Sequence, residues 1–334
     1  MTAKKLKIIN LSIFLAFFYG YGDCRKIFQG YQNYTTYKTG TLNVILTVPH
    51  GGSMKPSSIK DRTIACANSE GQCTWKTDCH QPTSNCTPLV ESDYNVQLLA
   101  DTISEKLKDI TGKYPYIIQT ELKRNKLDPN RDKPEATLFD PEAIKAWNDF
   151  QNYIKEAKNE IKKGLLLDIH GQSHIEKWIE LSYFAKISEI NSDQLQSDKS
   201  SIYTMSKRFP ETKFNELIYG NESYGGLLES KGYKVVPSPS YKKPGSGNYF
   251  PAYYITMEHG SMKGGNIDAI QVETPFAYRR NLTYISRYAE DVASVTVEFL
   301  KKYYGSTSSG AERVLISIPS MILFISSFIM QLID

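Results

Sequence analysis

Two histidines in this chain directly follow apolar segments, and a glutamate ends a third. LNVILTV (42–48) runs through one proline into His50, LLLDI (165–169) runs into His170, and AIQV leads into Glu273. Two imidazoles and a carboxylate form the ligand set of many catalytic zinc ions, which keep a fourth position for water. A further carboxylate can take a proton from that water. These positions predict a metal centre for one zinc ion, with hydrolytic chemistry.

The chemistry needs one acidic ligand and one acidic base. Asp93 opens a helical segment and is the candidate ligand, whereas Glu273 is suited to be the base. Asp168 lies two residues before His170, so both share a face of the strand, and Asp168 can orient the imidazole from outside the metal ligands. His174 is four residues beyond His170, a spacing that could also chelate. Structural interpretations remain open, namely a helix N-cap for Asp93 and a salt bridge for Glu273.

Arginines frame the segment RNKLDPNR (124–131). A guanidinium pairs with a carboxylate through two parallel hydrogen bonds. Arg124, and the pair Asn130 and Arg131, would therefore suit a substrate with a free α-carboxylate if they lie near the metal. A solvated charged loop is the alternative, because several lysines crowd the same segment.

Apolar and β-branched runs alternate with helical periodicity along the chain, which is typical of an α/β domain. Continuous apolar strands indicate a mixed, largely parallel sheet that is flanked by helices on both faces. In such sheets ligands bind beyond the carboxyl ends of the strands, which is where His50, His170 and Glu273 fall. The predicted strands are 42–48, 116–119, 165–169, 181–184, 235–236 and 270–272, and the predicted helices are 94–110, 142–162 and 284–303.

The two ends of the chain differ from the body between them. Residues 1–22 combine lysines with a short apolar stretch and predict a secretory signal peptide, with a retained anchor as the alternative. Residues 305–334 combine small residues, a polar spacer and an apolar tail, which resembles a GPI-attachment signal; a C-terminal transmembrane anchor is the alternative. Residues 23–304 then form a single domain at the cell surface, held to the membrane by its C-terminus.

Cysteines and glycosylation sequons agree with export through the secretory pathway. Four cysteines crowd the loop 66–86, where two disulfides are expected in an oxidising compartment. The four cysteines allow three disulfide pairings, and a zinc knuckle is the alternative to disulfides. Cys24 is distant from the four in the sequence. Sequons predict a glycosylated surface. The residues are Cys66, Cys73, Cys79 and Cys86 for the disulfides, and Asn33, Asn85, Asn221 and Asn281 for the glycans.

The charge balance argues against nucleic acid as a partner. The formal net charge of +4 falls to about +2 once residues 1–22 and the C-terminal tail are removed. A nucleic-acid-binding domain usually carries a strongly basic patch or stripe, so we expect none of that class here.

Five motifs occur in this order along the chain: VPHGG (48–52), the helix start at Asp93, RNKLDPNRD (124–132), LDIHGQ (167–172) and IQVETPFAYR (270–279). They resemble the motifs of the N-formylglutamate amidohydrolase-like family, which belongs to the zinc carboxypeptidase and aspartoacylase fold group. A sixth stretch, YFPAYYITMEHGS (249–261), resembles a segment of secreted animal relatives.

The resemblance implies a three-layer sandwich like that of zinc carboxypeptidases and a metal-dependent enzyme. Such an enzyme cleaves an amide next to an amino-acid carboxylate, as in an N-acyl (N-formyl-like) amino acid or a small peptide. His50 and His170 match the histidine ligands, and Glu273 matches the catalytic glutamate. Arg131, after Asn130, matches the carboxylate-binding pair. His259 and Arg279 are further candidates for the substrate pocket.

One position departs from the pattern. Zinc carboxypeptidases place a glutamate three residues after the first histidine, where this chain has Ser53. The acidic ligand must then come from elsewhere, and Asp93 is the candidate, with Glu91 behind it. The departure keeps two other functions open: a surface ectodomain with weakened catalysis that acts in adhesion or binding, and a metallocarboxypeptidase.

Overall fold

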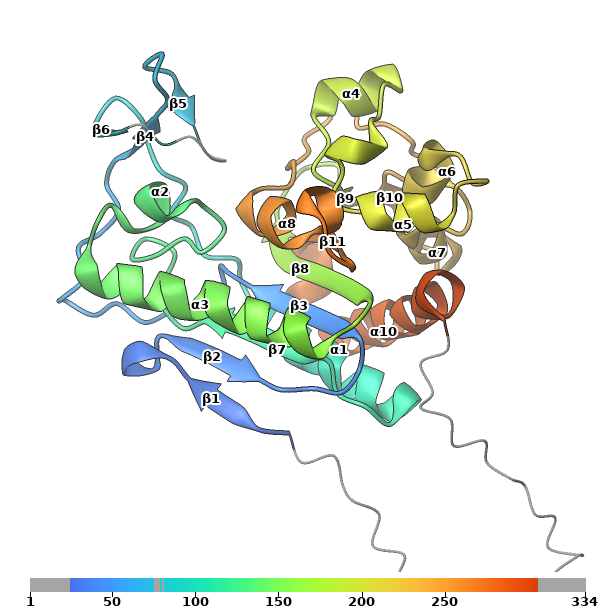
Figure 1. Cartoon of the computed structure of the whole chain (residues 1–334), viewed down its shortest axis with the longest axis horizontal. Helices are drawn as coiled ribbons and strands as arrows, with labels where there is room; N and C mark the ends of the chain where they lie inside the picture. Colours follow the sequence, from blue (N-terminus) through green and yellow to red (C-terminus); the bar gives the residue numbers. More distant parts are fainter. Residues whose placement is uncertain (1–24, 75–78, 80, 306–334) are drawn as a thin grey trace, which may run out of the picture.

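The computed structural model describes residues 25–74, 79 and 81–305. The predicted signal peptide, Cys24 and the tail from residue 306 lie outside this part of the chain. The described residues build an eight-stranded sheet in the order β1-β2-β7-β3-β8-β11-β9-β10, with helices on both faces (Figure 1). The predicted α/β sandwich with a mixed, largely parallel sheet is confirmed.

The strands of the large sheet include all six that the sequence predicts, together with β1 and β2. A separate three-stranded sheet, β5-β4-β6, lies in the cysteine-rich loop. The strands are β1 (Ile27–Gln29), β2 (Thr35–Lys38), β3 (Val44–Val48), β4 (Ala65–Ala67), β5 (Cys73–Thr74), β6 (Gln81–Thr83), β7 (Tyr116–Thr120), β8 (Gly164–Gln172), β9 (Ile179–Ser182), β10 (Val235–Val236) and β11 (Ile267–Pro275).

The three long helices are also those that the sequence predicts, with ends shifted by a few residues. Short helices fill the segment between β9 and β11. The helices are α1 (Val96–Thr111), α2 (Lys133–Thr137), α3 (Pro141–Glu160), α4 (Ile187–Ser192), α5 (Tyr203–Arg208), α6 (Phe214–Tyr219), α7 (Tyr224–Ser230), α8 (Tyr254–His259), α9 (Phe276–Arg279) and α10 (Leu282–Tyr304).

Parallel pairing at the centre of the sheet aligns the strand ends that carry the candidate residues. β3 is parallel to both β7 and β8, and β8 is parallel to β11 over nine residues of each strand. In that register His170 lies opposite Glu273. β1, β2 and β9 add the antiparallel pairs.

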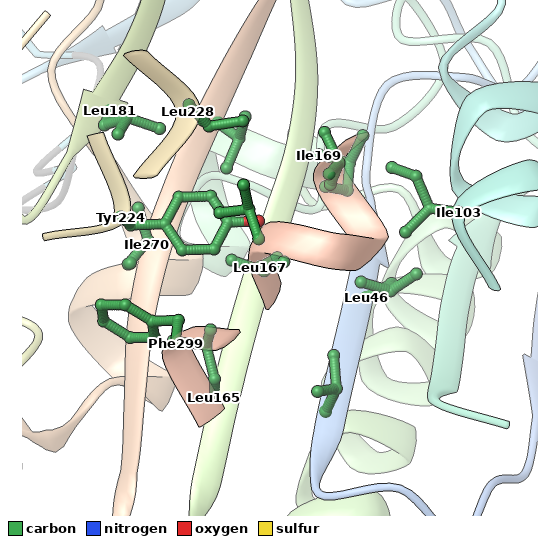
Figure 2. Packing of buried hydrophobic residues seen from close by; sticks show 14 of the residues in the cluster. Leu46, Ile103, Leu165, Leu167, Ile169, Leu181, Tyr224, Leu228, Ile270 and Phe299 are labelled. Carbon is green, nitrogen blue, oxygen red and sulfur yellow. The ribbon is translucent and has the colours of Figure 1, made fainter. Parts of the chain in front are cut away.

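Two hydrophobic cores separate the sheet from its helices. On one face α1 and α10 pack against β3, β8 and β11, and Figure 2 shows Leu46, Ile103, Leu167 and Phe299 within this core. On the other face α3 supplies Phe150 and Ile154. Both faces of the central strands are therefore buried, which is why these strands are apolar without alternation.

Two disulfides join the cysteine-rich loop, Cys66 to Cys79 and Cys73 to Cys86. This settles the pairing that the sequence left open and favours disulfides over a zinc knuckle. Such bonds persist in oxidising compartments and suggest an extracellular or secreted protein. Across residues 25–74, 79 and 81–305, every helix is too short or too polar to span a bilayer.

Candidate metal centre

His50, Asp93 and His170 come together at the carboxyl edge of the sheet; both histidines are buried, and the Asp93 side chain is only 9% exposed. One ligand atom from each lies within 4.8 Å of the other two, and the imidazole centroids are 4.7 Å apart. Asp93 Oδ2 lies 3.5 Å from His50 Nδ1 and 3.3 Å from His170 Nδ1. Ligand bonds of about 2 Å around one zinc ion would put neighbouring ligand atoms at about these separations.

The two imidazoles present the same nitrogen to the centre. His50 Nε2 lies 2.7 Å from Asp128 Oδ1, and His170 Nε2 lies 2.9 Å from Asp168 Oδ2. Each carboxylate favours a proton on Nε2, which leaves the lone pair of Nδ1 facing Asp93. His50 Nδ1 is buried and has no hydrogen-bond partner in the described structure. A buried acceptor without a partner is costly, so this donor set fits a metal ion.

Asp93 reaches the centre from the loop before α1. Its side chain accepts a hydrogen bond from Gly171 N at 3.0 Å, and its own N–H donates to His50 O at 2.9 Å. The N-cap of α1 is Asn95, so the alternative that Asp93 caps this helix is wrong. A Cβ at position 171 would collide with the guanidinium of Arg279, which explains the glycine.

Electrostatics at the centre favour a charged Asp93 and a proton on Glu273. Burial alone would raise the pKa of Asp93, but the interactions of this carboxylate with His170 and His50 outweigh burial and lower that pKa. Burial, together with the charges of Asp93 and Glu180, raises the pKa of Glu273 to about 8. Glu273 Oε1 lies 4.0 Å from His170 Nδ1, so a cation at the centre would oppose this shift.

Asp128 is a functional residue that the sequence reasoning missed. It is fully buried, holds His50, and accepts a hydrogen bond from Arg124 Nε at 2.9 Å. Burial would raise its pKa, but the charges of His50, Arg124 and Arg131 hold that pKa well below its usual range. The only signal of Asp128 in the sequence is the Asp-Pro step inside 124–131.

The residues of the segment 124–131 have separate positions. Arg124 lines the cavity above the metal centre, whereas Arg131 is buried with its guanidinium 4.3 Å from the ring centroid of Tyr253 and does not line that cavity. Asn130 Nδ2 donates to Asp168 Oδ2 at 3.3 Å and so supports the carboxylate that holds His170. The substrate-binding roles of Asn130 and Arg131 stay predictions, and Arg124 is the member of this segment that a ligand can reach.

A cavity of about 910 Å³ opens over the metal centre. Arg279 lines it, but its guanidinium donates to the carbonyls of Thr274, Gln172 and Tyr94, which ties it to the wall. His174 also lines the cavity, and its Nδ1 lies 2.7 Å from Glu180 Oε1.

Several predicted residues take no part in the metal group. His259 is buried beneath α3, where its Nε2 lies 2.7 Å from Gln151 Oε1, and it does not line the cavity. Glu91 lines the cavity, but the carboxylate in the metal group is that of Asp93. Ser53, the position that departs from the family pattern, is exposed. The four sequon asparagines are exposed as well, which is compatible with glycans: Asn33, Asn85, Asn221 and Asn281.

Comparison with known proteins gives remote structural similarity only. No family model and no curated protein sequence matches the chain. The gene product Atu2144 from Agrobacterium tumefaciens has a TM-score of 0.45 at 10% identity, covering 82% of this chain and 96% of that one. N-formylglutamate amidohydrolase from Ralstonia eutropha JMP134 has a TM-score of 0.42 at 12% identity, covering 81% and 98%. The CwlD amidase from Clostridioides difficile has a TM-score of 0.31 at 13% identity, covering 79% and 98%.

Proposed function

We propose that this protein is an extracellular, zinc-dependent amidohydrolase that cleaves the amide bond of an N-acyl amino acid or small peptide with a free carboxylate. The observation that carries the proposal is the group of His50, Asp93 and His170. Both imidazole Nδ1 atoms face the Asp93 carboxylate, and each Nε2 atom is held by a different aspartate, Asp128 for His50 and Asp168 for His170.

A bound zinc ion would supply Lewis-acid polarisation of the amide carbonyl and a lowered pKa for the attacking water. Glu273, whose Oε1 lies 4.0 Å from His170 Nδ1, would take a proton from the attacking water as the new C–O bond forms. The same carboxyl would return that proton to the amide nitrogen as the C–N bond breaks. Its hydrogen bond from Gln271 Nε2, at 3.1 Å, fixes the orientation of the carboxyl group.

Arg124 is the residue that we assign to the substrate carboxylate. Its Nε is bonded to Asp128 and its Nη1 lies 3.4 Å from the carbonyl of Glu91, which holds the guanidinium at the cavity wall. The positive charge of Arg124 attracts the substrate carboxylate to this part of the cavity wall, whereas the acidic side chains of the cavity would repel that carboxylate from other positions.

The extracellular part of the proposal has separate support. Two disulfides and four exposed sequon asparagines fit a protein that passes through the secretory pathway. Anchoring at the cell surface, by GPI or by a retained helix, rests on residues 306–334, which lie outside the described structure.

The test combines metal analysis with one substitution. We expect about one zinc ion per chain, removed by chelator together with hydrolysis of acyl amino acids or short peptides. Glu273→Gln keeps Oε1, so we expect zinc content to persist while kcat falls by a factor of about 1,000 or more. Wild-type activity in that variant would refute the role of Glu273.

A binding ectodomain is the second candidate, favoured by one observation. Ser53 stands where zinc carboxypeptidases have their acidic ligand, so the metal site is built differently. A stable protein that takes up no zinc and hydrolyses neither acyl amino acids nor peptides would support this candidate. Cleavage of peptides alone, from their C-termini, would instead support a metallocarboxypeptidase.

A further inference from the structure

The wall of the cavity above the metal centre is largely apolar. Leu89 and Val90 lie in the loop before Asp93, and the aromatic members come from both sides of the cavity. Three apolar side chains of this wall are unusually exposed for their type: Leu89 at 42%, Tyr94 at 56% and Phe276 at 46%. Large exposed apolar surface around a hollow marks a place where an apolar ligand group is buried. The aromatic residues are Tyr94, Phe250, Tyr253 and Phe276.

Three of the aromatic side chains that line the cavity are in contact with other rings of its wall. The rings of Tyr94 and Phe276 have centroids 5.8 Å apart, although one precedes α1 and the other starts α9. Phe250 packs against the imidazole of His174, with ring centroids 4.5 Å apart. These contacts hold the aromatic rings in place before a ligand arrives, which reduces the entropy lost on binding.

Charge in the cavity limits the substrate to one carboxylate. Among the described residues that line it, the arginines are Arg124 and Arg279, and there is no lysine. Each of the three guanidinium nitrogens of Arg279 already donates to a backbone carbonyl, so Arg124 is the arginine that we assign to the carboxylate. Glu91 and Asp93 lie on the same surface, and their charges would repel a second carboxylate.

We infer that the substrate carries, besides its single carboxylate, a large apolar group that is buried against this wall. This inference deepens the function proposed above and rests on it for the amide and the carboxylate. The apolar group has two possible sources, an aromatic or aliphatic amino-acid side chain or a long acyl chain. A short acyl group on glutamate fits poorly, because its second carboxylate meets acidic residues and apolar surface.

Three compounds test the inference: N-formylphenylalanine, N-octanoylglutamate and N-formylglutamate. Their dissociation constants are measured by calorimetry on the zinc-loaded Glu273→Gln protein, where binding needs no turnover. We expect at least one apolar compound to bind about 10–100-fold more tightly than N-formylglutamate, the effect of burying one large apolar group. The compound that gains affinity identifies the source of the apolar group.

Substitutions at the wall give the matched control. Leu89→Ser and Phe276→Ser change half-exposed side chains, so we expect the fold to persist and the apolar advantage to fall about 3–10-fold each. Ile110→Ser changes a residue that is 49% exposed at the other end of α1, and we expect no change.

The outcomes separate this inference from the proposed function. Tighter or equal binding of N-formylglutamate, or equal effects of Leu89→Ser and Ile110→Ser, would overturn the inference. Preferred binding of an apolar compound, combined with no hydrolysis by the wild-type protein, would support the inference while refuting the enzyme.

Discussion

His170 and His259 are both buried histidines, yet their surroundings oppose each other. Around His170, burial disfavours charge, but the charge of Asp168 and its hydrogen bond outweigh burial and raise the pKa well above its usual value. Around His259, burial and the charges of Lys158, Lys155 and Lys263 all act together and hold the pKa well below its usual value. Burial is therefore shared by both histidines, and the neighbouring charges distinguish the candidate metal ligand, His170, from the core residue, His259.

The largest expected effect is on metal affinity. His170→Gln provides no atom at the position of Nδ1, so we expect zinc to bind more weakly by more than about 100-fold, because one of three ligands is lost. His259→Gln is the matched control, since its amide can still donate to Gln151. Competition with a chromophoric chelator measures both affinities.

A comparable loss of zinc affinity in both variants would contradict the distinction between His170 and His259. It would mean that both histidines affect zinc binding through the stability of the fold. Thermal unfolding of the two metal-free variants, measured alongside, reports that contribution directly.

A smaller effect is expected from the carboxylates behind the ligands. Asp128→Asn and Asp168→Asn keep the shape of the side chain but remove the charge that orients each imidazole. We expect zinc affinity to fall about 10–100-fold in each. Asp168 also accepts a hydrogen bond from Thr47 Oγ1 at 2.7 Å. Thr47→Val removes this bond, which lies one residue further from the metal centre, and should lower zinc affinity by a smaller factor than either aspartate substitution.

Unchanged zinc affinity in both aspartate variants would contradict this assignment. An effect confined to Asp128→Asn would show that the two imidazoles are held by different means. Calorimetric titration of zinc into the chelator-treated proteins distinguishes these outcomes.

The sequence alone predicts those strands and site residues whose position follows from a local pattern of residue types. β3, β8 and β11 are continuous apolar runs that end in a polar residue, and parallel pairing necessarily brings such ends to one edge. The convergence of His50 and His170 was predictable for that reason. Asp168 was predictable too, because residues two apart share a face of a strand.

Other features depend on contacts between distant segments, which one sequence does not encode locally. Asp128 acquires its role because its loop folds back against His50, 78 residues earlier in the chain. Arg131 is predicted as a substrate ligand from its type and neighbours, and its contact with Tyr253, more than 100 residues later in the chain, is one that the sequence does not show. β2 was missed because its residues, TTYK, lack an apolar run; it pairs with β7, and its Tyr37 is buried by packing against α3.

The smallest expected effect is on the pH dependence of stability. The lowered pKa of His259 means that the unfolded chain binds a proton more readily than the folded protein. This histidine therefore contributes stability above pH about 6.5, and the contribution is lost as pH falls below that value, by up to about 1.4 kcal/mol per pH unit. Urea unfolding of the chelator-treated protein between pH 7.5 and 5.5 should show a shallower decline for His259→Gln than for the wild type.

Gln151→Glu sharpens the same test by giving His259 the kind of neighbour that His170 has. A carboxylate in place of Gln151 Oε1, which lies 2.7 Å from His259 Nε2, should raise the pKa of the imidazole. We therefore expect this variant, like His259→Gln, to lose less stability than the wild type between pH 7.5 and 5.5. If the free energy of unfolding of both variants fell with pH as steeply as that of the wild type, protonation of His259 would not be linked to unfolding. The lysines near His259 would then not account for its difference from His170.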